Sequence, residues 1–408
     1  MTVSVRNRIA NDKRIVGLAV SCLVIGIFAF QAWATHLFYT DPYTGGNDFY
    51  SRWYGAREMI IEGRDPYSLE VTEEIQPVIG VDPASIGRGG FAYPLHVIFL
   101  FWPLVYLSYP LALAIWMTIA QWLLIAIVIL LVKLNEWRLK PFAIAGIIIG
   151  SLMLYPVTRS IIIGQFTVHV VFFLVGSIFL LRRGHDGWAG ALLAATSIKP
   201  QMVILTAPWI VIWAIANRRW RFIRGLLIGG SLILVASLAL YPKWPLRFIQ
   251  DVQRYSKVSG GRNPLAVALD QILPGVGDPT RISVMVVLLL VTAYFCWRGL
   301  SGDKDSFTRA TYLTIIMGLV VVFQTGSTNQ VLLIILIIDW LAQLHRRKNG
   351  SALVVAVLLA LVFFPWLLFM NTLDGRGESE VMFVPLPLIA LIVLGFLSYR
   401  SRLRPQMT

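Results

Sequence analysis

Asp48 is the carboxylate best placed for chemistry in this sequence. It follows the Gly-Gly-Asn stretch at residues 45–47, where a polar loop turns into an amphipathic segment. A carboxylate fixed at such a point can act as a general base and take a proton from a hydroxyl group. Aspartate is also favoured at the N-cap of a helix, so on the residues alone a purely structural role stays open. Asp41, in a less regular stretch, is the reserve candidate.

Lys199 is the clearest charged residue in apolar surroundings. It lies in Ser-Ile-Lys-Pro at residues 197–200, with largely apolar sequence on both sides. Such charges are costly and are functional candidates for that reason. Pro200 interrupts a helix here, which is tolerated only against protein or a wet cavity. An ammonium beside such a cavity can bind a phosphate as a point charge; the alternative is a structural ion pair or a lysine extending to the membrane surface.

Two polar residues between positions 155 and 165 raise similar questions. Arg159 allows the same alternatives as Lys199. Gln165 stands at an expected helix start, where its amide can donate to a sugar hydroxyl or serve helix packing. Motifs for a phosphate loop, a zinc protease or a serine hydrolase are absent. The Asp-x-Asp pair at 303–305 falls in an expected cytoplasmic loop, so we predict no metal site and no cofactor.

The composition indicates that membrane helices must position these residues. Of 408 residues, 57% are hydrophobic and 14% are charged, whereas soluble domains carry roughly 25% charged residues. Apolar runs of near-spanning length recur from end to end, each about the 17–25 residues needed to cross a bilayer. They predict an all-α integral membrane protein, a single polytopic domain over residues 1–408 with about 12 transmembrane helices. The clear runs are residues 15–34, 111–132, 142–155, 166–181, 226–241, 282–297, 310–323, 331–344, 353–370 and 384–397.

The net charge of +14 is distributed as expected for a membrane protein rather than for a nucleic-acid-binding protein. Basic clusters at 218–224, 345–348 and 400–404 lie between or after apolar runs, the pattern of cytoplasmic loops. Two long loops are then exported. Residues 35–90 hold nine acidic and four basic residues, and residues 242–281 hold six basic and three acidic ones. The basic excess of the second loop favours an anionic ligand near the membrane, such as a lipid phosphate.

The topology between residues 91 and 216 stays open. Prolines interrupt 91–107 and 188–216, so each is either a crossing or a re-entrant hairpin. Single crossings place the basic loops 133–140 and 182–186 outside; hairpins place both inside and move Gln165 and Lys199 toward the outer face. Charge favours hairpins, and helix length favours crossings.

The first exported loop also contains an amphipathic segment. Its apolar side chains recur at helical spacing on one face, which predicts a juxtamembrane helix along the membrane surface. These side chains are Phe49, Trp53, Ala56 and Ile60.

Several short motifs occur in a characteristic order along the chain. They are Asp48-Phe49 with Tyr54 and Ala56, then residues 63–67, 91–94, 164–165, 182–184, 189–190, 198–200, 218–221 and 261–265. In these motifs the chain resembles the polyprenol-phosphate-mannose-dependent mannosyltransferases of glycosyltransferase family 87, within the GT-C superfamily. The resemblance implies a GT-C-type helical bundle in a bacterial cytoplasmic membrane, with the active site facing the periplasm or cell exterior. It also implies an inverting, metal-independent reaction with a polyprenyl-phosphate sugar as donor.

The resemblance assigns roles to particular residues. Asp48 matches the position of the catalytic aspartate. Lys199, Gln165 and Asn263 match positions near the donor pocket, and we expect Arg159 and Arg262 to contribute to donor binding. The chain departs from the family where Tyr93-Pro94 is followed by leucine and where a late exported turn, 326–330, lacks a histidine. The expected acceptor or late-loop contacts are Asn329, Gln330 and Tyr93.

The expected function is therefore transfer of a hexose, with mannose as first candidate, to a lipid-linked or cell-wall glycan. The expected partners are this donor, this acceptor and membrane lipids, without nucleic acid. Two alternatives remain. A transporter or flippase of an amphipathic anion predicts inverted repeats with matched broken helices, and a non-catalytic subunit of a membrane complex predicts that Asp48 is dispensable.

Overall fold

The computed structural model describes residues 3–43, 45–82, 89–259, 263–275, 277–322, 326–373 and 378–403. These residues form helices, and no strand occurs among them. The α-helices are α1 (Val3–Thr35), α2 (Asn47–Ile61), α3 (Leu69–Val78), α4 (Tyr109–Leu134), α5 (Pro141–Met153), α6 (Tyr155–Ile162), α7 (Thr167–Arg182), α8 (Asp186–Ala195), α9 (Thr206–Ala216), α10 (Trp220–Leu240), α11 (Trp244–Ser259), α12 (Pro264–Ile272), α13 (Asp278–Gly299), α14 (Lys304–Val321), α15 (Ile334–His345), α16 (Gly350–Thr372) and α17 (Pro385–Leu403). The short helices are η1 (His36–Thr40), η2 (Leu95–Leu100), η3 (Trp102–Tyr106), η4 (Thr196–Ile198), η5 (Pro200–Val203), η6 (Ser327–Leu333) and η7 (Glu380–Phe383).

Helix length and composition identify a multi-pass membrane protein. Within the described ranges, 6 helices are long and apolar enough to cross a membrane, or up to 7 if the pair α5–α6, bent by 66°, is one span. The six are Arg14–Thr40, Tyr109–Leu134, Trp220–Leu240, Asp278–Gly299, Ser327–His345 and Gly350–Thr372. Shorter apolar helices, such as Thr167–Arg182, accompany them. The expected count of about 12 spans exceeds what length and composition support and stays a prediction.

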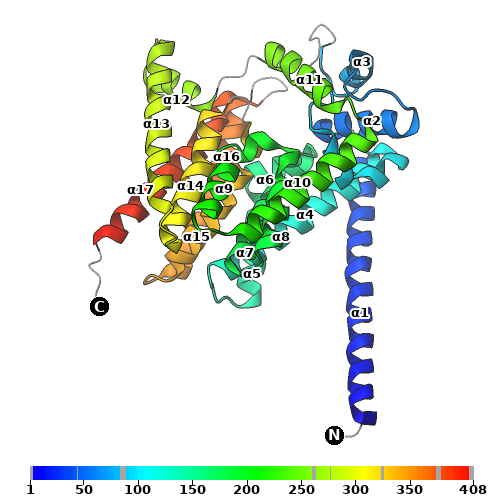
Figure 1. Ribbon diagram of the computed structural model, residues 1–408, viewed down its shortest axis with the longest axis horizontal. Helices are drawn as coiled ribbons and strands as arrows, with labels where there is room; N and C mark the ends of the chain where they lie inside the picture. Colours follow the sequence, from blue (N-terminus) through cyan, green and yellow to red (C-terminus); the bar gives the residue numbers. More distant parts are fainter. Residues whose placement is uncertain are drawn as a thin grey trace.

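The loops separate into two ends of the bundle. Arg219 Nη2 lies 2.8 Å from Asp186 Oδ1, and Arg346 donates to the carbonyl of Asn135 at 2.9 Å. We call the end formed by residues 133–140, 182–186, 217–224, 300–308 and 345–348 the basic end. Helices α2, α3, α11 and α12 gather at the opposite end, the loop end (Figure 1).

Residues 186–216 form a hairpin whose two ends both lie at the basic end. Helix α8 leaves the basic end at Asp186, and α9 ends beside Asn217, which bonds to the carbonyl of Leu300 at that same end. A helix of 10 residues spans about 15 Å, roughly half of a bilayer core. Two glycines let α8 lie directly against α10, because a Cβ on Gly190 would overlap the carbonyl of Phe222 and one on Gly225 the carbonyl of Gly187. The geometry agrees with the hairpin alternative for this segment, and its place relative to the membrane stays a prediction.

Residues 91–107 form the two short 3₁₀ helices η2 and η3 instead of a crossing helix. They cover the apolar face of α2: Phe49 and Ala56 are fully buried, and Trp53 donates to the carbonyl of Leu104 at 2.9 Å. The apolar face of α2 thus contacts protein, not the lipid that the amphipathic pattern led us to expect.

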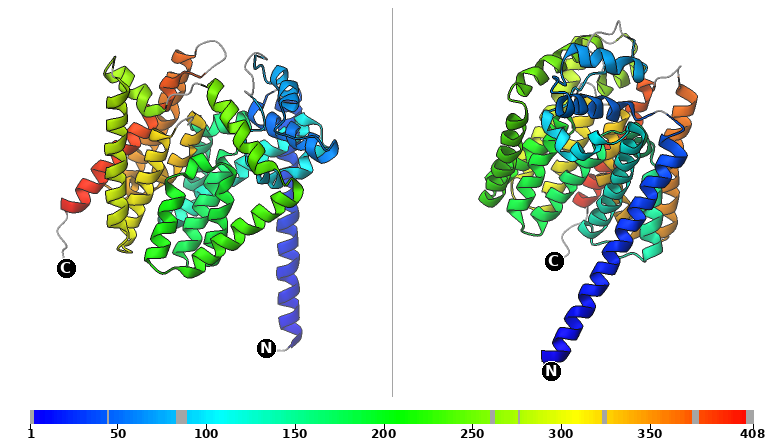
Figure 2. Two further views of the ribbon diagram at one scale, coloured as in Figure 1. Left: turned by 45° about the horizontal axis from the view of Figure 1, so that its top comes forward. Right: turned by 90° about the vertical axis from the view of Figure 1, so that its right-hand side faces the viewer.

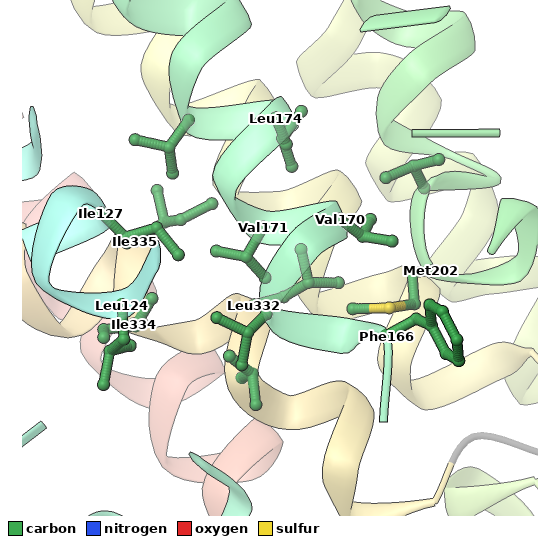
Figure 3. Close-up of a cluster of buried hydrophobic side chains, with 14 of the residues drawn as sticks. Leu124, Ile127, Phe166, Val170, Val171, Leu174, Met202, Leu332, Ile334 and Ile335 are labelled. Atoms are coloured by element: carbon green, nitrogen blue, oxygen red, sulfur yellow. The ribbon is translucent and has the colours of Figure 1, made fainter. Parts of the chain in front are cut away.

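The apolar core centres on α7. Figure 3 shows Val170, Val171 and Leu174 of this helix among side chains of α4 and of the η6–α15 segment. By contrast, α1 lies at the edge and runs past the end of the bundle (Figure 2). Its attachment to α4 includes a polar contact, because Gln31 donates to Gln121 at 2.7 Å.

Candidate active site

Three side chains from distant segments form a continuous polar chain at the loop end. Gln165 Nε2 donates to Asp48 Oδ2 at 2.7 Å, and Lys199 Nζ donates to Gln165 Oε1 at 2.7 Å. The amide thus joins a carboxylate to an ammonium, donating to the first and accepting from the second. Charge-assisted hydrogen bonds of this kind are stronger than those between neutral groups.

Asp48 is the second residue of α2, and the N-cap position belongs to Gly46, with a φ of 71°. The amide of Asp48 donates to the carbonyl of Ile163 at 3.1 Å, which ties the start of α2 to the segment that carries Gln165. Arg52, one turn later, lies 3.5 Å from Asp48 Oδ1. The Asp48 side chain keeps 34% of its surface exposed, so its carboxylate is held by neighbours and still accessible.

Gly164 is required where α2 meets this segment. Its φ is 72°, in the region where residues with a Cβ are strained, and a Cβ there would overlap the Cβ of Phe49. Phe49 itself is locked by Trp116, whose ring stacks on it at 5.0 Å and whose indole nitrogen donates to the carbonyl of Gly164 at 3.0 Å. Close backbone approach therefore sets the position of Asp48 relative to Gln165.

Replacing Gly164 by alanine is expected to displace the start of α2 and to destabilise the protein by about 1–3 kcal/mol. Gly146→Ala is the matched control, because Gly146 lies in α5 and a Cβ there would meet nothing within 4 Å. Thermal unfolding in detergent compares the two variants. A Gly164→Ala protein that unfolds at the temperature of the control would contradict this account.

Lys199 lies at the break in the hairpin of residues 186–216. The residue separates η4 from η5, with φ −141° and ψ 74°, and Pro200 follows. The residue is 5% exposed. An ammonium carries three donors, and its described hydrogen bond to Gln165 uses one of them. Among the described contacts, no hydrogen bond uses its other two donors.

Tyr93 joins the same cluster from the segment before η2. Its hydroxyl donates to Gln165 Oε1 at 3.1 Å, and the guanidinium of Arg52 lies 4.4 Å from the centre of its ring. Cation–π contacts within about 6 Å are attractive. Gln165 Oε1 therefore accepts from both Tyr93 and Lys199, which fixes the direction of its amide.

Arg159 belongs to a second polar cluster. Its Nε lies 3.3 Å from Glu378 Oε2, and Tyr155 donates to Glu378 Oε1 at 2.7 Å. The Glu378 side chain is 10% exposed. Glu378 was not among the expected site residues, because nothing in its local sequence distinguishes it from other acidic loop residues.

The other candidates lie apart from the chain Asp48–Gln165–Lys199 in their described contacts. Asn263 caps α12 by accepting from Ala266 at 2.7 Å. Asn329 and Gln330 are buried in η6, and Gln330 donates to the carbonyl of Phe383 at 3.0 Å. Arg262 lies outside the described residues. Among the residues that are described, no three His, Cys, Asp or Glu side chains group as metal ligands.

The fold and this cluster define a multi-pass membrane protein with an accessible carboxylate coupled to a buried ammonium at one end of its bundle. A family model, glycosyltransferase family 87, matches residues 91–268. The match confirms the resemblance over this segment, which is less than half of the chain and includes Tyr93, Gln165 and Lys199. Asp48 precedes it. Comparison with curated proteins and with solved structures gave no match.

Proposed function

We propose that this protein is a membrane glycosyltransferase that moves a hexose, with mannose as first candidate, from a polyprenyl-phosphate sugar to a lipid-linked or cell-wall glycan. The observation that carries the proposal is the hydrogen-bonded chain from Asp48 through Gln165 to Lys199. It places a group that can accept a proton and a group that can bind a phosphate on either side of one amide.

The proposed reaction is a single displacement with inversion. The acceptor oxygen attacks the anomeric carbon while Asp48 takes its proton. The bond from that carbon to the phosphate oxygen breaks, and both electrons leave with the polyprenyl phosphate. Lys199 stabilises the negative charge that develops on this phosphate. Gln165 and Tyr93 keep the carboxylate and the ammonium at a fixed separation.

The charge distribution supports an outward-facing site. Basic loops of bacterial membrane proteins stay in the cytoplasm, and the clusters at 182–186, 217–224 and 345–348 lie at the basic end. The site lies at the other end, which we assign to the periplasmic or exterior face of a bacterial cytoplasmic membrane. In the second exported loop, Arg247, Arg254 and Arg281 are ion-paired with carboxylates. The carboxylates of Asp251 and Asp270 belong to this loop and were already counted, so only the pair of Arg247 with Asp65 of the first loop lowers its basic excess.

The class of reaction is tested with membranes from a host that lacks its own enzyme. We expect the full chain to transfer label from polyprenyl-phosphate mannose to an extractable lipid or glycan acceptor. Polyprenyl-phosphate glucose and arabinose are compared in parallel, together with a nucleotide sugar. Transfer from the nucleotide sugar alone would contradict the proposed donor class. If none of the donors is used while labelled lipid phosphate crosses the membrane, the transporter alternative replaces the transferase.

A further inference from the structure

A buried carboxylate of the second exported loop holds the backbone just after the first exported loop, at Ala92. Asp251, on α11, is 1% exposed, and its Oδ2 accepts from the amide of Ala92 at 2.8 Å. Its Oδ1 accepts from Arg254 Nη2 at 3.3 Å, and that nitrogen also donates to the carbonyl of Tyr67 at 2.7 Å. Residues separated by 159 positions in the sequence are thus connected through one carboxylate.

The backbone that Asp251 binds is strained. Ala92 has a φ of 44°, a conformation that costs free energy for a residue with a Cβ and persists where the surroundings hold it. The next residue is Tyr93, whose hydroxyl donates to Gln165 Oε1 at 3.1 Å. On the other side, a Cβ on Gly90 would lie 2.8 Å from Thr72 Oγ1, whereas its distance of 3.5 Å from Asp251 Oδ1 would be an ordinary contact.

The proposed displacement does not use Asp251 as a base, because the side chain is enclosed and its two oxygens are already bonded. Burial raises the pKa of this carboxyl, and the Ala92 amide and the Arg254 guanidinium act in the opposite direction. An isolated buried carboxylate is costly, so the partners on both oxygens account for its presence. The Asp251 side chain instead holds the backbone at Ala92 in its left-handed conformation.

We infer that Asp251 is a positioning residue: it holds Ala92 in the left-handed conformation and so sets Tyr93 against Gln165. The effect on catalysis rests on the proposed function, whereas the effect on the backbone does not. Helix α11 is then part of the active-site framework, through the bond from the Ala92 amide to Asp251.

The test compares three variants of the full-length protein. Asp251→Ala removes the acceptor of the Ala92 amide, Asp251→Asn keeps an acceptor oxygen without the charge, and Gln250→Ala changes an exposed neighbour on α11. Hydrogen exchange at the Ala92 amide is measured in detergent, and sugar transfer is measured as kcat and donor KM. We expect Asp251→Ala to speed exchange about tenfold or more and to lower kcat about tenfold to hundredfold with little change in KM.

Asp251→Asn is expected to recover most of both losses, and Gln250→Ala to behave as the wild type. Unchanged exchange in Asp251→Ala would overturn the inference, whether or not transfer is observed. Faster exchange with an unchanged kcat would overturn the positioning role in the reaction. If the wild-type chain transfers no sugar, the proposed function is wrong, and so is the role of Asp251 in catalysis. Hydrogen exchange at the Ala92 amide still tests whether Asp251 holds the backbone.

Discussion

Asp48→Asn is expected to lower the rate of sugar transfer by about 10²–10⁴-fold, the range for loss of a general base. Asparagine has the shape of aspartate and can still bond to Gln165, so the site should keep its geometry. It cannot take the proton of the acceptor hydroxyl. We therefore expect kcat to fall while the donor KM stays within about threefold, as for an interaction made only in the transition state.

Two further measurements keep this prediction decisive. Asp305→Asn makes the same chemical change in an exposed residue at the basic end and should transfer sugar at the wild-type rate. Thermal unfolding of Asp48→Asn should match that of the wild type. If the folded Asp48→Asn protein transfers sugar as fast as the control, Asp48 is not the base, and Asp41 becomes the carboxylate to test.

Lys199→Met is expected to lower transfer by about 10²–10³-fold, the range for loss of one group that stabilises transition-state charge. Methionine is of similar length and carries no charge, so it removes the ammonium and leaves Gln165 Oε1 bonded to Tyr93 alone among its described partners. The negative charge on the departing lipid phosphate then lacks its buried cation. The measurement is kcat and KM with polyprenyl-phosphate mannose.

Lys133→Met is the matched control, since Lys133 is exposed near the end of α4. Lys199→Arg adds a second criterion. A guanidinium is larger and planar and differs from an ammonium as a point charge, so we expect arginine to restore little of the lost rate. Full activity in Lys199→Met would show that the ammonium has a structural role only, and the proposed phosphate site would then have to be sought elsewhere.

The sequence predicted the class of fold because membrane helices leave a strong, local signal. Long apolar runs such as Tyr109–Leu134 and Gly350–Thr372 appear as spans in the structure. Residues 91–107 were harder to predict, because short 3₁₀ helices have no sustained period and the prolines show only that a long helix is interrupted. In residues 186–216, total length suggested a crossing while charge suggested a hairpin. The ion pair between Asp186 and Arg219 brings the two ends of this segment together, as the hairpin alternative requires.

The candidate site was predictable only in part. Asp48, Gln165 and Lys199 were each noticed because a polar group stood at a helix start or in apolar sequence. Their connection, over separations of 117 and 34 residues, depends on tertiary packing that no local pattern encodes. The same holds for Glu378, which lies 223 residues from Tyr155, and for Asp251 on α11.

The hairpin of residues 186–216 also bears on how the protein is made. The segment with Asp48 and Tyr93 belongs to loops that gather at one end of the bundle, whereas Lys199 reaches the site on a hairpin whose two stems start from the other end. With the orientation proposed above, the two halves of the site would be delivered by different events in a cell: translocation of a loop, and insertion of a hairpin from the cytoplasmic side. The contact of Lys199 with Gln165 would then form late in biogenesis. If the hairpin were inserted incorrectly, the loops could fold at the outer surface while the site lacked the Lys199 ammonium.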